Sequence, residues 1–378
     1  MNEHRPGSKL LITQEGLKRL MAALSALGDL IGPKAIGGVL TYARISGPED
    51  MPRGMTDEQS AGRYRLLPSG REAYFDFTLG AQGWKSFFSP PSVELFSVSN
   101  GADGYTITQP EPALRPLVLF GVRPCELAAI AMQDKIYTQG DHVDQVYAAR
   151  RKDAFIVAIN CARPSGGCFC VSMGTGPRAQ AGFDIALTEV LEGTDHFFLA
   201  ESGSAAGEKV LSELGFPPAG DGQVAVAEKT SSTAAGRMGR AINQNGLKDA
   251  LYASYNHPQW AKTGQRCLSC GSCAAVCPTC FCLKYEDYTD LAGKASRKRG
   301  WDVCLGRDYS YIHGGPARPS AMARYRHFVI HKLASWIDQF GSPGCVGCGR
   351  CIVWCPAGID ITQHAAAIGG AAKPGGGS

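Results

Sequence analysis

The feature that most constrains this 378-residue chain is a cysteine pattern that occurs twice. Each run has the spacing C-x2-C-x2-C-x3-C and is followed directly by a proline. The two runs comprise Cys267, Cys270, Cys273 and Cys277, and then Cys345, Cys348, Cys351 and Cys355. The chain has fifteen cysteines, an odd number, and such tight groups fit metal binding better than a framework of disulfides.

This spacing is typical of bacterial ferredoxins, in which three closely spaced thiolates hold one [4Fe-4S] cluster and the fourth reaches a second cluster. Gaps of two residues let one loop wrap three corners of a cube, and the turn of helix that follows carries the fourth thiol away. The pattern therefore predicts two [4Fe-4S] clusters. The expected ligands are Cys267, Cys270, Cys273 and Cys355 for cluster one, and Cys345, Cys348, Cys351 and Cys277 for cluster two.

Structural zinc is the main alternative for these cysteines. Zinc sites normally use paired C-x2-C arms, whereas here three thiols are followed by C-P in both runs. Iron–sulfur binding is therefore favoured. The long stretch between the runs includes a predicted helix at residues 321–340, and this arrangement resembles the α-helical ferredoxin module of respiratory iron–sulfur subunits.

Patterns outside the runs predict two domains. A helix capped by Thr13 should end at Gly28, because its apolar residues recur at helical spacing. Further on, two apolar strands at 116–122 and 153–160 flank a helix that starts near Pro124, which is typical of a parallel α/β unit. We expect an α/β (α+β) domain at residues 1–260, an α-helical ferredoxin-like domain with two clusters at 261–365, and a flexible tail at 366–378.

Composition and the lengths of the apolar runs indicate the cellular location of the protein. Charged residues make up 19% of it, the longest apolar runs are far too short to span a bilayer, and the first residues do not resemble a signal peptide. The formal charge of +4 leaves out metal-bound thiolates, which are deprotonated. We therefore expect a cytoplasmic protein with no membrane span and no nucleic-acid partner.

Four of the remaining cysteines follow the two predicted strands: Cys125, Cys161, Cys168 and Cys170. Strand ends in α/β folds are common places for ligand loops, so these thiols could hold a third iron–sulfur centre. The alternative is that they are small buried apolar residues, or that they pack beside the first two clusters. The last three cysteines, Cys280, Cys282 and Cys304, are an incomplete set that we expect to pack beside the clusters.

Motifs for other chemistry are missing. The glycines at 174–182 have the wrong spacing for a dinucleotide site, and the chain has neither a P-loop nor H-E-x-x-H. No motif supplies a nucleophile with a base, so we assign no catalytic residue. These observations favour a protein that carries electrons and performs no bond chemistry.

The segments "FGVRPCELAAI", "CFCVSMGTGP", "CPTCFC", "RGWDVC" and "CVGCGRCIVWCP" together resemble a known family. The resemblance runs from about Leu117 to Ile361, with a weaker match at "KSFFSPPSVELF". The family is that of the β subunit of sulfhydrogenases, which are cytoplasmic NAD(P)-linked [NiFe] hydrogenases, and of the equivalent electron-transfer subunit of anaerobic sulfite reductases. Its cluster ligands correspond to the eight cysteines of the two runs.

The resemblance implies an electron-transfer subunit of an oxidoreductase complex. One partner would be an FAD/NAD(P)-binding diaphorase subunit, and the other would be the small and large subunits of a [NiFe] hydrogenase. The alternative is the equivalent subunit of an anaerobic sulfite reductase, with a sulfite reductase catalytic subunit as partner. A structural or sensory iron–sulfur protein and a stand-alone enzyme are less favoured.

Overall fold

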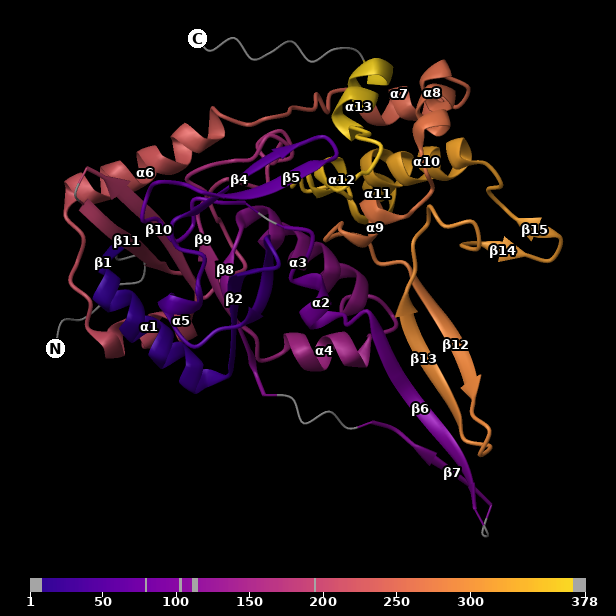
Figure 1. Ribbon diagram of the computed structural model, residues 1–378, viewed down its shortest axis with the longest axis horizontal. Helices are drawn as coiled ribbons and strands as arrows, with labels where there is room; N and C mark the ends of the chain where they lie inside the picture. Colours follow the sequence, from indigo (N-terminus) through magenta and orange to yellow (C-terminus); the bar gives the residue numbers. More distant parts are fainter. Residues whose placement is uncertain (1–8, 79, 102–103, 111–114, 194, 370–378) are drawn as a thin grey trace.

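The computed structural model describes residues 9–78, 80–101, 104–110, 115–193 and 195–369. Its main element is a seven-stranded mixed sheet (Figure 1). In spatial order the strands are β1 (Lys9–Ile12), β11 (Asp195–Ser202), β10 (Ile185–Glu192), β9 (Phe155–Ile159), β8 (Leu117–Val122), β2 (Asp29–Ile36) and β3 (Val39–Arg44). The central strands β10, β9, β8 and β2 run parallel, and the outer pairs are antiparallel.

Helices cover both faces of this sheet. One face packs against α1 (Gln14–Leu27) and α5 (Ala205–Leu214), and the other packs against α3 (Pro124–Tyr137), α4 (Gln145–Arg151) and α6 (Asp221–Ala235). Side chains along β8 alternate between the two faces of the sheet. Val118 and Phe120 lie in the core under α1, and Leu119 lies in the core under α3. The parallel strands are therefore buried on both sides, as their continuous apolar sequences require.

The predicted local elements of this region are confirmed. Helix α1 begins after Thr13, whose Oγ1 accepts a hydrogen bond from the backbone N–H of Gly16 at 3.1 Å, and it ends at Gly28. The strand–helix–strand prediction corresponds to β8, α3 and β9, and Pro124 is the first residue of α3. The fold therefore contains the parallel α/β unit that the sequence indicates.

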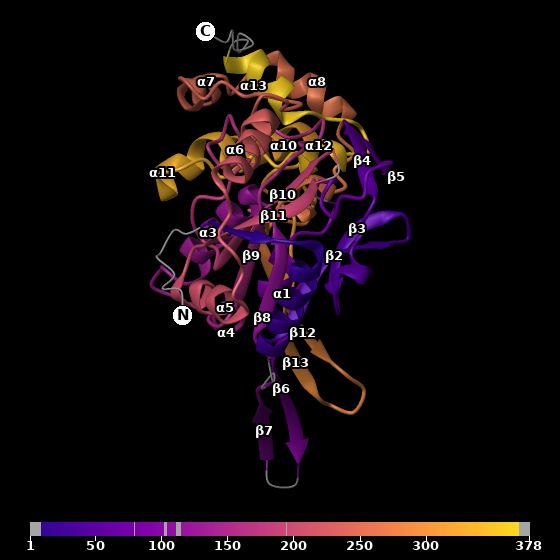
Figure 2. The ribbon, with the colours of Figure 1, turned by 90° about the vertical axis from the view of Figure 1, so that its left-hand side faces the viewer.

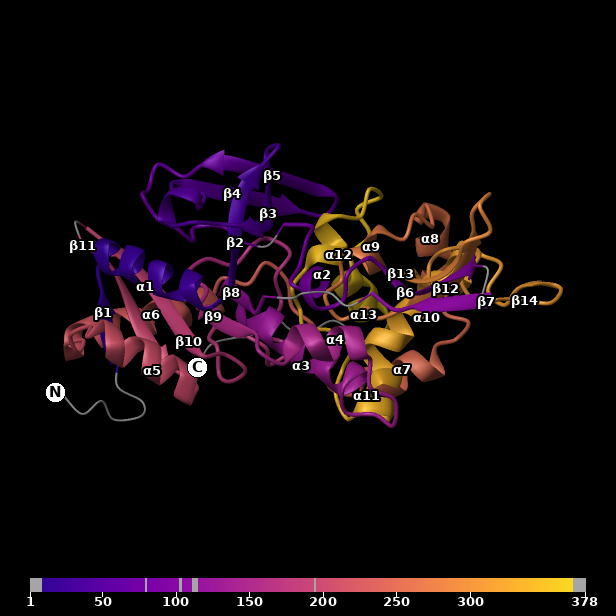
Figure 3. The same ribbon diagram turned by 90° about the horizontal axis from the view of Figure 1, so that it is seen from below.

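The cysteine-rich region lies at the other end of the molecule from α1, α5 and α6 (Figures 1 and 3). Its helices are α7 (Leu247–Ala253), α8 (Pro258–Arg266), α9 (Ser272–Ala275), α10 (Ala321–Ile330), α11 (Trp336–Phe340), α12 (Arg350–Val353) and α13 (Ile361–Gly369). The predicted helix at 321–340 is present, but a π-helical stretch, His331–Ser335, joins α10 to α11. Helix α13 includes 366–369 of the expected tail, and 370–378 lie outside the described residues.

Hairpins interrupt this helical region, and no local sequence pattern predicted them. They are β12 (Leu283–Thr289) with β13 (Ala295–Trp301), and β14 (Tyr311–Ile312) with β15 (Gly315–Pro316). The mixed α/β character of the chain is shown by these elements together with the large sheet. The α-helical ferredoxin description and the boundary near residue 260 stay predictions.

A second sheet joins the two halves of the sequence. Its order is β12-β13-β6-β7, and β6 (Ser92–Gly101) pairs antiparallel with β13. This sheet, completed by β7 (Gly104–Thr108), extends away from the rest of the molecule in Figures 1 and 2. The basic stretch of β13 is largely paired within the chain, because Arg297 binds Asp287 and Arg299 binds Asp144.

Shorter elements complete the described structure. Hairpin β4 (Met55–Ser60) and β5 (Arg63–Pro68) contacts the cysteine-rich region, where the backbone N–H of Gly62 donates to the carbonyl of Ile352 at 3.0 Å. A short 3-10 helix, Pro48–Asp50, and helix α2 (Lys85–Phe88) complete the set. Among the described residues, no helix is long and apolar enough to cross a membrane.

A buried ion pair connects the α/β part to the second cysteine run. The guanidinium of Arg350 donates to Glu126 of α3 at 2.7 Å, and both side chains are only 1% exposed. The hydroxyl of Tyr42 also donates to the Glu126 carboxylate, at 3.2 Å. Since an isolated charge is costly in such a place, each member of the pair depends on the other.

We predict that Glu126→Ala lowers the free energy of unfolding by about 3–5 kcal/mol, because it leaves the Arg350 charge buried without a partner. The measurement is anaerobic urea unfolding followed by tryptophan fluorescence. Asp287→Ala, which breaks the exposed pair with Arg297, is the control and should change stability little. Equal losses for the two variants would contradict a structural role for the buried pair.

Candidate iron–sulfur sites

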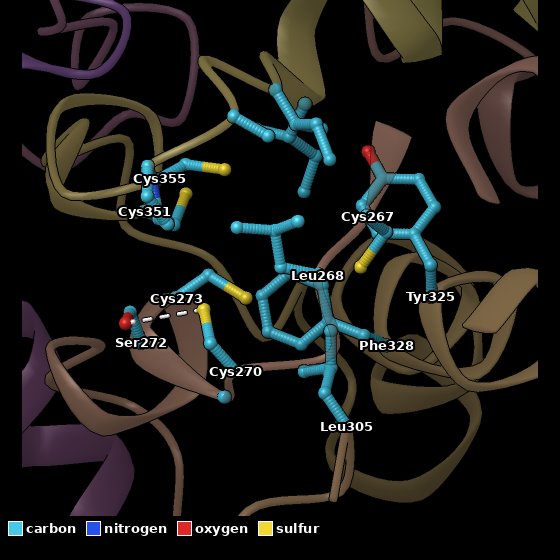
Figure 4. A pocket seen from close by; sticks show the side chains of 15 residues that line it. Cys267, Leu268, Cys270, Ser272, Cys273, Leu305, Tyr325, Phe328, Cys351 and Cys355 are labelled. Carbon is cyan, nitrogen blue, oxygen red and sulfur yellow. Dashed lines mark hydrogen bonds between the residues drawn. The ribbon is translucent and has the colours of Figure 1, made fainter. Parts of the chain in front are cut away.

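Thiols of both cysteine runs meet around one cavity. Its walls include Cys267, Cys270 and Cys273 of the first run, and Cys351 and Cys355 of the second run (Figure 4). The remaining lining is largely apolar and includes Leu268, Leu305, Tyr325, Phe328, Ile359 and Ile361. Cys355 is therefore placed with the three thiols that we expected it to join, although it is distant from them in sequence.

Local backbone geometry produces this arrangement. Gly271 has φ +74°, in the left-handed region, and helix α9 starts directly after it. The short helix carries Cys277 beyond the cavity, whereas the chain after α12 brings Cys355 of the second run into the cavity wall. The Cys270 sulfur and the Ser272 hydroxyl lie 3.3 Å apart, which is a hydrogen-bond contact.

The other thiols of the second run lie near Cys277. Burial, together with the neighbouring Cys277 sulfur, raises the pKa of Cys345 to about 11 and that of Cys348 to about 12. Burial also raises the pKa of Cys351, and the sulfurs of Cys345 and Cys277 contribute to it. The structure thus gathers Cys345, Cys348, Cys351 and Cys277 into a second group beside the first.

Two glycines of the second run are required by their surroundings. Gly347 and Gly349 have φ values of +66° and +73°. A Cβ atom on Gly347 would lie 2.6 Å from the Phe169 carbonyl carbon, and one on Gly349 would lie 2.2 Å from the Gly167 oxygen. The loop after β9 therefore presses directly on the loop that carries Cys345, Cys348 and Cys351.

A buried ammonium lies among the second group of thiols. Lys332, from the π-helical stretch, is 2% exposed, and its Nζ donates to the Thr279 hydroxyl at 2.6 Å. No carboxylate forms an ion pair with it in the described part of the chain, and its main favourable electrostatic interactions are with the sulfurs of Cys277, Cys280 and Cys345. A buried cation of this kind fits a negatively charged iron–sulfur cluster held by these thiolates.

Cys280, Cys282 and Cys304 lie beside the two groups. A hydrogen bond with the Cys280 thiol and the Lys332 ammonium both lower the pKa of Cys277, although burial opposes them. The pKa of Cys282 falls to about 6, chiefly through a hydrogen bond with the Cys304 thiol. This position is consistent with the prediction that these three thiols pack beside the clusters.

The four cysteines after the strands are also brought near one another. Burial raises the pKa of Cys125, and the sulfurs of Cys170, Cys348 and Cys161 raise it further. Cys168 lies in the same loop, where the backbone N–H of Ser165 donates to its sulfur at 3.4 Å. The group lies next to the second run, since the Cys348 sulfur raises the pKa of Cys125 and that of Cys170.

Three functional candidates could not be identified from sequence: Lys332, Arg123 and Lys85. Lysine and arginine are common, and only the fold shows that these cations face sulfur. Lys85, for example, donates to the Cys280 carbonyl at 3.3 Å, and its ammonium interacts with the sulfurs of Cys280 and Cys277. The one sequence signal was the position of Arg123, directly between a buried strand and a cysteine-bearing helix.

Both groups of thiols fit [4Fe-4S] clusters by donor type, apolar lining and neighbouring cations. Thiolate sulfur is the usual protein ligand of such clusters, and hydrogen bonds to the sulfurs are a normal part of their surroundings. In the described residues, no set of three or more histidine, cysteine, aspartate or glutamate side chains is arranged to hold a metal ion. The fit to clusters therefore rests on the cavity, the convergence of the two runs and the buried charge.

Comparison with known proteins agrees with this chemistry. The family model described as "4Fe-4S dicluster domain" matches residues 266–359. The chain is 33% identical over 331 residues to a protein of Pyrococcus furiosus named "Sulfhydrogenase 2 subunit beta", and the match covers 87% of this chain and 93% of that protein. No solved structure matches the chain. The chain therefore belongs to the sulfhydrogenase beta-subunit family, and its dicluster domain carries two [4Fe-4S] clusters.

Proposed function

We propose that this chain is the iron–sulfur electron-transfer subunit of a [NiFe] hydrogenase complex. It would relay electrons between an FAD/NAD(P)-binding diaphorase subunit and the small and large hydrogenase subunits. The observation that carries the proposal is the convergence of the two cysteine runs, with Cys355 beside the first run and Cys277 beside the second. Two adjacent redox groups in one chain, without a recognisable catalytic motif, suit conduction.

The proposed ligand assignment gives each cluster the first three cysteines of one run and the fourth cysteine of the other run. We assign Cys267, Cys270, Cys273 and Cys355 to cluster one, and Cys345, Cys348, Cys351 and Cys277 to cluster two. Support for cluster one comes from the shared cavity, and support for cluster two comes from the electrostatic coupling of its thiols to Cys277. Cys351 lines the cavity as well, which is consistent with two clusters that lie side by side.

When bound, each [4Fe-4S] cluster can take up and release one electron. The chain's own residues create the conditions for this exchange. Leu305, Phe328 and Ile361 line the cavity with apolar surface and limit the access of water. Lys332 places a positive charge beside the thiolates of cluster two, which favours the reduced and more negative state. Helix α3 and Arg350 hold the second binding loop in position.

The choice of hydrogenase over sulfite reductase rests on the relative. The protein named as a sulfhydrogenase subunit is similar over most of both chains, so we infer an equivalent complex here. An anaerobic sulfite reductase remains the alternative, and the partner that copurifies would distinguish the two complexes. Because many cysteines that serve as thiolates rather than disulfides are typical of a reducing compartment, we place the protein in the cytoplasm.

We predict that Cys273→Ser combined with Cys348→Ser reduces NAD(P)H-linked hydrogen turnover of the purified complex at least tenfold. Anaerobic iron analysis of the two single variants should show that each loses about four irons. Cys304→Ser, which removes a buried thiol outside both runs, is the matched control and should retain both clusters. Full turnover by the assembled double variant would rule out the relay.

We also predict that Lys332→Met lowers the reduction potential of cluster two by tens of millivolts, on the order of 100 mV at most. The cause is the loss of a buried positive charge beside Cys277 and Cys345. A redox titration followed by electron paramagnetic resonance measures the change. Lys248→Met, which removes a partly exposed lysine paired with Asp338, should leave the potential unchanged. No difference between these variants would contradict the role of Lys332.

A further inference from the structure

Four cysteines outside the dicluster runs share one edge of the main sheet. Cys125 follows β8 as the second residue of α3, and Cys161 follows β9 after one residue. Since β8 and β9 are adjacent and parallel, their carboxyl ends lie together. The loop after β9 then supplies Cys168 and Cys170. Cys125 and Cys170 are buried, and Cys161 and Cys168 are partly buried.

The loop that carries these thiols is held firmly by its neighbours. The backbone N–H of Phe169 donates to the Gly347 carbonyl at 2.8 Å, and the Thr175 hydroxyl donates to the Val346 carbonyl at 2.6 Å. The N–H of Arg240 also donates to the Cys168 carbonyl at 3.0 Å. The four thiols therefore lie directly beside the binding loop of cluster two.

A buried guanidinium next to these thiols has no carboxylate partner. Arg123 is 2% exposed, and its Nη2 donates to the carbonyls of Phe75 at 3.1 Å and Phe77 at 2.6 Å. Its Nη1 points to the Cys161 sulfur, 3.8 Å away. Within the part of the chain that the structure describes, no acidic side chain forms an ion pair with it. A buried charge without compensation is costly, so this position calls for an anion.

The counter-charges of two other buried cations in this chain can be compared with those of Arg123. Arg350 has a carboxylate partner in Glu126. Lys332 has none and lies instead among thiols of proposed cluster two. Arg123 follows the pattern of Lys332, because its nearest candidate counter-charge is sulfur. Four uncharged thiols would leave the guanidinium unbalanced, whereas thiolates that bind a cluster would neutralise it.

We propose that Cys125, Cys161, Cys168 and Cys170 hold a third iron–sulfur centre at the carboxyl ends of β8 and β9. Arg123 supplies the buried positive charge beside it. The proposal rests on the proposed electron-transfer function and extends it, because a redox group at this position continues the line of clusters from the second run into the α/β part. That part would then conduct electrons as well as support the dicluster region.

The first test is a count of iron and acid-labile sulfide per chain in the anaerobically purified protein. Two [4Fe-4S] clusters account for about eight irons, and a third centre raises the count to about ten or twelve. The double variant Cys161→Ala with Cys168→Ala should lose only the additional two to four irons and one paramagnetic resonance signal. Met238→Leu is the matched control, since Met238 contacts the Cys170 sulfur at 3.9 Å and is no ligand in this proposal.

A wild-type count of about eight irons would overturn the third centre and leave the two-cluster function intact. Zinc in place of the additional iron would overturn it too. A wild-type count of ten or twelve that the double variant keeps in full would place the extra iron elsewhere. Because the wild-type count needs no mutant, the proposal is testable even if the double variant fails to fold. Failure of the dicluster assignment would appear separately, in the iron counts of Cys273→Ser and Cys348→Ser.

Discussion

The convergence of two cysteine runs that are distant in sequence is the constraint on which the rest of this structure depends. Thiols of both runs line one cavity, so the two loops that carry them must lie side by side. The chain between Cys277 and Cys345 therefore has to leave and return. It does so through β12, β13 and the helical stretch α10–α11, and the Thr279 hydroxyl donates to the Gly344 carbonyl at 2.8 Å near the closing point.

The α/β part completes this arrangement rather than standing apart from it. The loop at 167–170 packs so closely on the second run that only glycine suits positions 347 and 349. Strand β6 adds to β13, which lies between the two runs, and Glu126 pairs with Arg350. Together these contacts fix the loop that carries Cys345, Cys348 and Cys351 relative to the main sheet.

Buried charge gives the clearest physical link between fold and function. Arg350, Arg123 and Lys332 are all almost fully buried, yet only Arg350 has a carboxylate partner among the described residues. The other two face sulfur. Unpaired cations in a protein interior require anions there, and the proposed thiolate-bound clusters would supply them.

Local sequence determined a good deal of this protein by itself. Helix α1, the β8–α3–β9 unit and the helix at 321–340 were predictable, because capping, apolar periodicity and strand length act over a few residues. The spacing of the two runs indicated the clusters, which the dicluster-domain match supports. Only the tertiary structure decided that β6 pairs with β13, that 331–335 is π-helical, and that Lys332 and Arg123 face sulfur. Those outcomes depend on contacts between residues far apart in the chain, which no local pattern encodes.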